Sequence, residues 1–81
     1  MRTVLIPIGH GNYVNCDHLL AVVRFQSAPV MRQVQAARDE GMVIDATMGR
    51  RTLSVLYMDS GHLVLSANQP DTIAKRANDD D

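Results

Sequence analysis

Two adjacent arginines are the clearest chemical feature of this sequence. Arg50 and Arg51 lie within residues 48–52, which read MGRRT. Like charges repel, so two neighbouring guanidiniums cost free energy, and their forked donors suit successive phosphates or a narrow groove of a nucleic acid. Solubilisation of the surface explains such a pair equally well, and the spacing alone leaves both interpretations open.

The other candidates for chemistry do not form a legible catalytic or metal site. His10, His18 and His62 lack the i, i+4 helical spacing and the paired Cys and His residues that mark a zinc site. Cys16 comes two residues before His18, but we interpret it as a small apolar residue rather than a nucleophile. The GHG of residues 9–11 has neither the spacing of a dinucleotide site nor the Lys of a P-loop, so a tight turn explains it. We expect no enzymatic activity, no metal, no cofactor and no small-molecule substrate.

Length and composition predict a small globular protein that associates with itself. The chain has 81 residues, of which 46% are apolar and 21% charged. A lone domain of this size buries only about 60% of the surface that its unfolded chain exposes, so a metal, a disulfide or self-association usually supports it. The single cysteine forms no internal disulfide, which favours self-association.

We expect a cytoplasmic protein with no membrane partner. No apolar run approaches the roughly 20 residues that span a bilayer. The VLIPI of residues 4–8 is too short and too interrupted by proline to be a signal peptide.

The net charge of −1 is unevenly distributed, because most of the chain is weakly basic. Three of the nine acidic residues are the final Asp79, Asp80 and Asp81, an acidic tail, so residues 1–78 carry eight basic and six acidic groups, or +2. Seven of the eight basic residues are arginine, which makes planar, bidentate contacts with phosphates and bases. Three aromatic residues and no tryptophan offer few platforms for stacking unpaired bases, which favours duplex DNA over RNA or single strands.

Hydrophobic periodicity and turn residues predict an α+β fold, a single small domain of residues 1–78 with a mostly antiparallel sheet and two helices. The apolar centre of residues 18–25 indicates burial on both faces, so we place this strand centrally in the sheet. The last three strands follow one another through short turns and predict a meander, with Arg50 and Arg51 at a hairpin tip. We expect strands over residues 2–8, 18–25, 42–46, 52–58 and 62–66, brief pairing over 13–15, and helices over 28–40 and 70–77.

Longer segments resemble a known family. The runs SAPVMRQVQAARDEGMVIDATMGRRTLSV at residues 27–55, MDSGHLVLSANQPDTIAKR at residues 58–76 and IGHGN at residues 8–12 are similar to the RemA family of bacterial biofilm-matrix regulators. The resemblance covers nearly the whole chain and implies a transcription regulator that binds double-stranded DNA. It also implies that small α+β protomers close into a homo-oligomeric ring and display basic residues around its rim.

The resemblance also implies roles for particular residues. The DNA-contacting basic residues of the family's hairpin fall on Arg50 and Arg51, and the Pro of its SAP motif, with a structural or oligomerisation role, falls on Pro29. We also expect His18 and Arg32 to contact DNA.

At position 18 this chain departs from the family, which usually has Arg there. His18 is mostly neutral at pH 7 and therefore supplies less positive charge to a phosphate. Arg24 or Arg32 compensates for the reduced positive charge at position 18 if the fold brings it to the same DNA-binding rim. Two alternatives stay open, a ring-forming adaptor for protein interactions with little DNA affinity and an RNA-binding module.

Overall fold

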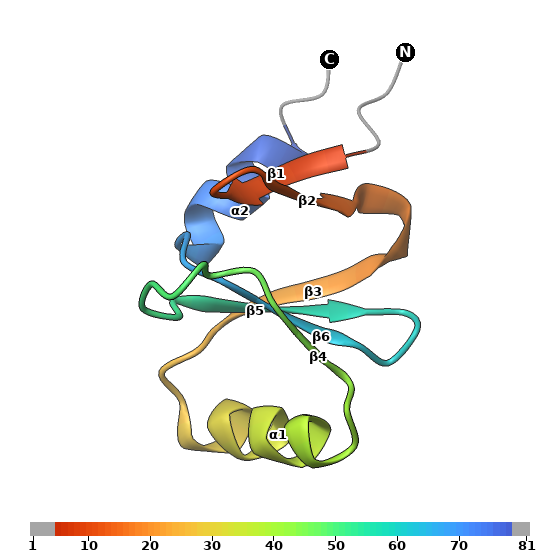
Figure 1. Cartoon of the computed structure of the whole chain (residues 1–81). Helices are drawn as coiled ribbons and strands as arrows, with labels where there is room; N and C mark the ends of the chain where they lie inside the picture. Colours follow the sequence, from red (N-terminus) through yellow and green to blue (C-terminus); the bar gives the residue numbers. More distant parts are fainter. Residues whose placement is uncertain (1–4, 79–81) are drawn as a thin grey trace.

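The computed structural model describes residues 5–78, which form three layers (Figure 1). A four-stranded sheet lies in the middle, helix α1 covers one face, and a two-stranded hairpin with helix α2 covers the other. The elements in chain order are β1 (Leu5–Gly9), β2 (Asn12–Asn15), a 3-10 turn (Cys16–His18), β3 (Leu19–Arg24), α1 (Ala28–Asp39), β4 (Val43–Asp45), β5 (Ser54–Met58), β6 (Leu63–Ser66) and α2 (Pro70–Ala77).

The predicted α+β class, the two helices and the mostly antiparallel pairing are confirmed. The predicted start of the first strand at residues 2–4 and the acidic tail at 79–81 lie outside the described residues. The brief pairing expected at residues 13–15 is strand β2, which forms a separate small sheet with β1.

Strands β5 and β6 form the centre of the larger sheet, whose order is β3-β5-β6-β4. Their side chains alternate between two cores because successive residues of a strand point to opposite faces. Leu56 and Val64 pack beneath the hairpin and α2, whereas Val55 and Leu65 pack against α1. The two central strands are therefore buried on both faces.

The prediction that residues 18–25 form a central strand is wrong. This segment is β3, at one edge of the larger sheet, and Leu20 is 70% exposed. A continuous apolar run is found both in central strands, which are buried on both faces, and in edge strands whose side chains are partly exposed. The run alone therefore does not tell the two apart.

The predicted meander is also wrong. β4 pairs in parallel with β6, and β6 lies between β4 and β5. Strands that follow one another in sequence pair or neighbour only about two-thirds of the time, and short turn signals do not reveal a crossover. Arg50 and Arg51 therefore lie in a loop between strands that are not neighbours, not at a hairpin tip.

Helix α1 has Pro29 in its first turn, where the missing amide hydrogen costs no helical hydrogen bond. The helix buries Val34 and Ala37 against the sheet. The Tyr57 hydroxyl of β5 donates to the side-chain oxygen of Gln33, which adds a polar contact between the two layers.

Candidate functional site

The loop between β4 and β5, residues 46–53, is here called the arginine loop. The backbone amides of Ala46 and Leu53 donate to carbonyls of β6, at 3.0 and 2.9 Å. Ala46 is buried in the core beneath the hairpin, whereas Arg50 and Arg51 are exposed. The loop is therefore fixed to the sheet at both ends and lies at one end of the sheet (Figure 1). Its two arginines are exposed there to solvent.

A tight turn gives the arginine loop its shape. The Arg50 amide donates to the Thr47 carbonyl at 3.0 Å, and Met48 and Gly49 between them have φ values of 55° and 81°. Positive φ at both central residues is the mark of a type I′ turn. Glycine adopts this conformation freely, but the side chain of Met48 makes it sterically costly.

Asp45, the acidic residue nearest to Arg50 and Arg51 in the sequence, is hydrogen-bonded to Thr47 at the start of this turn. The Asp45 carboxylate accepts from the side-chain hydroxyl of Thr47 at 2.6 Å and from its backbone amide at 2.9 Å. These hydrogen bonds hold the pKa of Asp45 below its ordinary value. Within residues 5–78, no carboxylate oxygen lies within 4.0 Å of the guanidinium of Arg50 or Arg51.

Arg24 shares this end of the sheet with the arginine loop. It is paired with Ser54, the first residue of β5, and it lines a small pocket together with Leu53, the last residue of the loop. Arg32 is exposed on the second turn of α1, the layer on one face of the sheet. Of the two residues considered as compensating cations, the structure therefore brings Arg24 beside the loop. Sequence reasoning could not decide this, because it depends on the pairing of β3 with β5.

His18 lies at the opposite end of the larger sheet. It ends the 3-10 turn before β3 and contacts Asp59, the residue after β5, whereas the arginine loop precedes β5. The five residues of β5, about 17 Å of extended chain, separate the two ends. The structure does not bring His18 together with Arg50 and Arg51 within one protomer.

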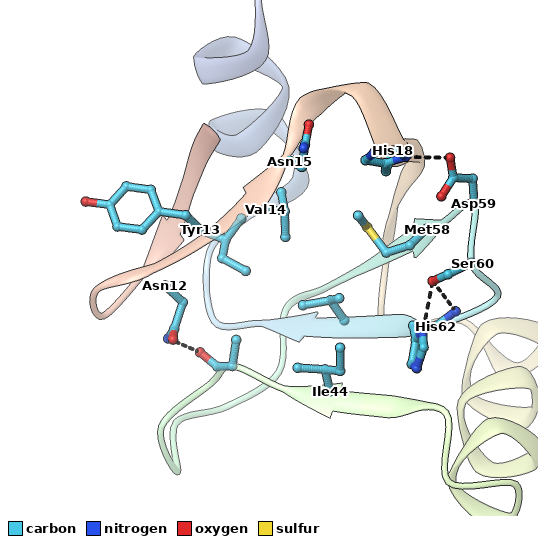
Figure 2. A pocket seen from close by; sticks show the side chains of 13 residues that line it. Asn12, Tyr13, Val14, Asn15, His18, Ile44, Met58, Asp59, Ser60 and His62 are labelled. Carbon is cyan, nitrogen blue, oxygen red and sulfur yellow. Dashed lines mark hydrogen bonds and ion pairs between the residues drawn. The ribbon is translucent and has the colours of Figure 1, made fainter. Parts of the chain in front are cut away.

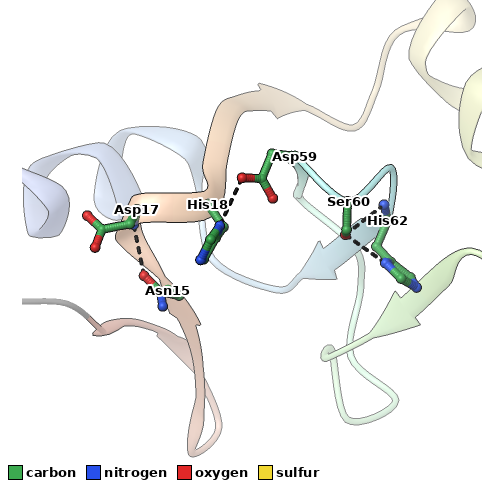
Figure 3. Close-up of polar contacts among 6 residues, drawn as sticks. All are labelled: Asn15, Asp17, His18, Asp59, Ser60 and His62. Atoms are coloured by element: carbon green, nitrogen blue, oxygen red, sulfur yellow. Dashed lines mark hydrogen bonds and ion pairs between the residues drawn. The ribbon is translucent and has the colours of Figure 1, made fainter.

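His18 instead forms an ion pair with a residue that the sequence did not reveal. Its Nδ1 atom lies 2.8 Å from Oδ2 of Asp59 (Figure 3). The hydrogen bond and then the charge of Asp59 raise the pKa of His18 above its ordinary value of 6.5. The pair stabilises the fold fully below the pKa of the unfolded state, and this contribution is lost as pH rises through the higher pKa of the folded state.

We expect Asp59→Asn to lower the pKa of His18 towards its ordinary value, because the amide has no charge to favour the imidazolium. An NMR titration of the His18 ring in both proteins measures this shift. Asp17→Asn is the matched control, since the more weakly acting Asp17 lacks the hydrogen bond and its loss lowers the pKa less. Equal His18 pKa values in the wild type and Asp59→Asn would contradict this assignment.

An open groove of about 540 Å³ lies between the hairpin and the larger sheet (Figure 2). Apolar side chains form its floor, among them Ile8, Ala46 and Val64. The rim is polar, with Asn12 near the arginine loop and the His18–Asp59 pair at the other end. The side-chain amide of Asn12 donates to the carbonyls of Gly9 and Ala46, at 3.1 Å each, and so connects the hairpin turn to the arginine loop.

The remaining chemical candidates have local contacts only. Nδ1 of His62 lies 2.8 Å from the hydroxyl oxygen of Ser60, and Cys16 packs, partly buried, against the core beneath the hairpin, as expected of a small apolar residue. In the part of the chain that the structure describes, no group of three or more His, Cys, Asp or Glu residues could hold a metal ion. Neither described helix combines the length and apolar character needed to cross a membrane.

Comparison with known proteins places the chain in a family. The family model described as Extracellular matrix regulatory protein A-like, or RemA-like, matches residues 5–77. The chain belongs to the RemA-like family. The family resemblance predicted from the sequence is thereby confirmed.

Curated bacterial relatives of this RemA-like chain are similar over nearly their whole length. It is 51% identical over 76 residues to Extracellular matrix regulatory protein A of Bacillus subtilis (strain 168), covering 94% of this chain and 85% of that protein. It is 54% identical over 76 residues, with the same coverage, to a putative regulatory protein of Clostridium perfringens (strain 13 / Type A). A putative regulatory protein of Clostridium novyi (strain NT) is 52% identical over 81 residues, covering 100% of this chain and 90% of that protein. The chain is therefore a regulatory protein of the RemA-like family.

Proposed function

We propose that this RemA-like protein binds double-stranded DNA as a cytoplasmic transcription regulator, with Arg50 and Arg51 as its principal contacts and with no catalytic activity. One observation carries the proposal. Two adjacent exposed guanidiniums, with no carboxylate partner among residues 5–78, lie on a loop fixed to the sheet at both ends. Because the backbone of the loop is held in place, little of its conformational freedom remains to be lost on binding.

Further cations extend this surface. Arg24 lies beside the arginine loop and adds a third guanidinium at the same end of the sheet. We propose that Arg32 and His18 make outlying contacts, Arg32 from the helix layer and His18 from the opposite end of the sheet. In an assembly, outlying contacts from one protomer can supplement the central contacts of another.

We propose that the protein acts as a homo-oligomeric ring. Both edges of the larger sheet carry a large exposed apolar side chain, Leu20 on β3 and Ile44 on β4, which are 70% and 50% exposed. Unpaired sheet edges with exposed apolar side chains favour association with another chain. Contact of one edge with the opposite edge of the next copy is head-to-tail, and such contacts generate a ring when the rotation closes. Pro29 then has a structural role at the start of α1.

The dependence of affinity on salt tests DNA binding by the wild type. If Arg50 and Arg51 each neutralise one phosphate, each engaged protomer contributes a slope of about −1.8 to log affinity against log salt. Raising salt from about 0.05 to 0.2 M should then weaken binding about 12-fold for each engaged protomer. Fluorescence anisotropy of a labelled duplex measures this, and the absence of saturable binding at the lower salt concentration would overturn the proposal.

We expect His18→Arg to strengthen DNA binding at pH values above the pKa of His18, because a permanent cation replaces an imidazole that is neutral there. Wild-type binding should tighten as pH falls through the pKa of His18, which Asp59 holds above its ordinary value of 6.5, because the imidazole gains its charge there. The His18→Arg variant should lose most of this pH dependence. Each added phosphate contact steepens the salt slope by about 0.9. Salt titrations of both proteins on one duplex, at one pH above and one pH below the pKa of His18, measure the effect.

Two outcomes separate the roles of position 18. Identical salt slopes and pH profiles for the two proteins would show that residue 18 lies off the DNA path. A loss of pH dependence without a steeper slope would show that His18 acts on the fold through Asp59 rather than by contact with phosphate.

The alternative of a protein-interaction adaptor is favoured by one observation. The cation at position 18 is paired with Asp59, so its charge is already countered within the protomer. The exposed edge residues Leu20 and Ile44 would serve an adaptor as well as a ring. Saturable, salt-dependent binding to duplex DNA would exclude an adaptor that lacks DNA affinity.

A further inference from the structure

Met48 is an exposed apolar side chain at the tip of the arginine loop. It is 66% exposed and belongs to neither core cluster. Its φ of 55° lies in the left-handed region that side-chain-bearing residues rarely adopt. Packing within the protomer therefore does not explain why a large apolar residue occupies this position.

The backbone conformation at position 48 is unfavourable for methionine. Glycine or asparagine fits a left-handed turn position at lower steric cost than methionine. Strained residues persist where the surrounding structure over-determines them, and they cluster at functional sites. Here the fixed ends of the loop and the Asn12 amide, which donates to the carbonyl of Ala46 at 3.1 Å, hold the strained turn in place.

The topology limits what the arginine loop can insert into a nucleic acid. Since β4 and β5 are separated by β6, the loop presents a single two-residue turn rather than a two-stranded ribbon. The major groove is about 12 Å wide and accommodates a helix or a ribbon, whereas the minor groove is about 6 Å wide. A single turn tip with two arginines behind it fits the narrower groove better.

We propose that Met48 is an apolar wedge that enters the minor groove of duplex DNA and partly unstacks a base step, while Arg50 and Arg51 contact the groove walls. Apolar side chains that enter a base step from the minor groove kink the duplex, and arginine beside them reads groove width and negative potential. This inference rests on the proposed DNA binding and adds the groove, the wedge and the bend.

Met48→Gly is the decisive variant because it removes the apolar side chain while the turn conformation is kept. Glycine relieves the steric strain at φ 55°, so the thermal unfolding temperature should be unchanged or higher by a few degrees. Loss of the apolar contact that Met48 makes with the DNA bases in the complex should weaken duplex binding about 10–100-fold. Energy transfer between dyes at the two ends of a short duplex with a central TA step should show a bend with the wild type and a straight duplex with the variant.

Two further variants make the test specific. Met48→Leu keeps an apolar wedge and should retain the bend and most of the affinity. Met31→Ala shortens an exposed methionine on α1 and should change neither the bend nor the affinity. Retention of full affinity and bend by Met48→Gly, or dissociation of the assembly by this substitution, would overturn the wedge.

Failure of the wedge is distinguishable from failure of DNA binding. If the wild type binds duplex and loses binding on removal of Arg50 and Arg51, but Met48→Gly behaves as the wild type, only the wedge is wrong. If the wild type does not bind duplex at all, the proposed function is wrong.

Discussion

The double variant Arg50→Ala/Arg51→Ala is expected to lose affinity for duplex DNA by a factor of about 10²–10⁴. A hydrogen bond to a charged group contributes about 1.5–3 kcal/mol, so two contacts contribute about 3–6 kcal/mol, and every 1.4 kcal/mol is a factor of ten. The slope of log affinity against log salt should also become shallower by about 1.8 for each engaged protomer. Anisotropy titrations at two salt concentrations measure both effects.

The same variant should retain its fold and its assembly. Both side chains are exposed, and substitutions at such positions change the free energy of unfolding by about 0.5 kcal/mol or less. Arg38→Ala/Lys75→Ala is the matched control, because it removes two positive charges from the two helices and should weaken binding much less. If the Arg50→Ala/Arg51→Ala variant binds duplex DNA as tightly as the wild type, the adaptor interpretation is favoured.

Leu20→Asp is expected to dissociate the assembly. Leu20 is 70% exposed on the edge strand β3, and a carboxylate placed there would have to be desolvated in the contact with a second copy. The mass measured by light scattering should fall from several protomers towards the 8.9 kDa of one chain. Duplex affinity should fall about 10²–10⁴-fold with it, because linked contacts become independent.

Circular dichroism separates dissociation from loss of the protomer fold. Unfolding together with dissociation also supports the assembly, since small obligate oligomers lack a stable folded monomer. Met31→Asp introduces the same charge at an exposed apolar position of α1 and should leave the mass unchanged. An unchanged mass for Leu20→Asp at micromolar concentration would exclude β3 as a subunit contact, and a folded wild-type monomer would exclude the ring.

Local features of this chain were predictable from its sequence. The helix expected at 70–77 is α2 (Pro70–Ala77), and the helix expected at 28–40 ends one residue earlier, as α1 (Ala28–Asp39). Pro near each helix start and helical spacing of apolar residues are short-range signals. The positive φ of Gly49 and Gly61 likewise follows from their place in tight turns.

Non-local pairing was not predictable. The parallel pairing of β4 with β6 and the edge position of β3 depend on which strands the hairpin and the helices cover. The His18–Asp59 pair joins residues 41 positions apart, and Arg24 reaches the arginine loop only through the pairing of β3 with β5. For the same reason the sequence placed Arg50 and Arg51 on a hairpin that the structure replaces with a crossover loop.

We propose that this RemA-like protein binds duplex DNA in preference to single strands and RNA. A direct comparison of labelled duplex DNA, its separate strands and RNA of the same sequence, titrated with the wild type at two salt concentrations, tests it most directly. We predict saturable binding to duplex that is at least about tenfold tighter than to single strands or RNA, because the chain offers few aromatic side chains for stacking unpaired bases. Equal or tighter binding to RNA, or no saturable binding to duplex at low salt, would contradict the claim.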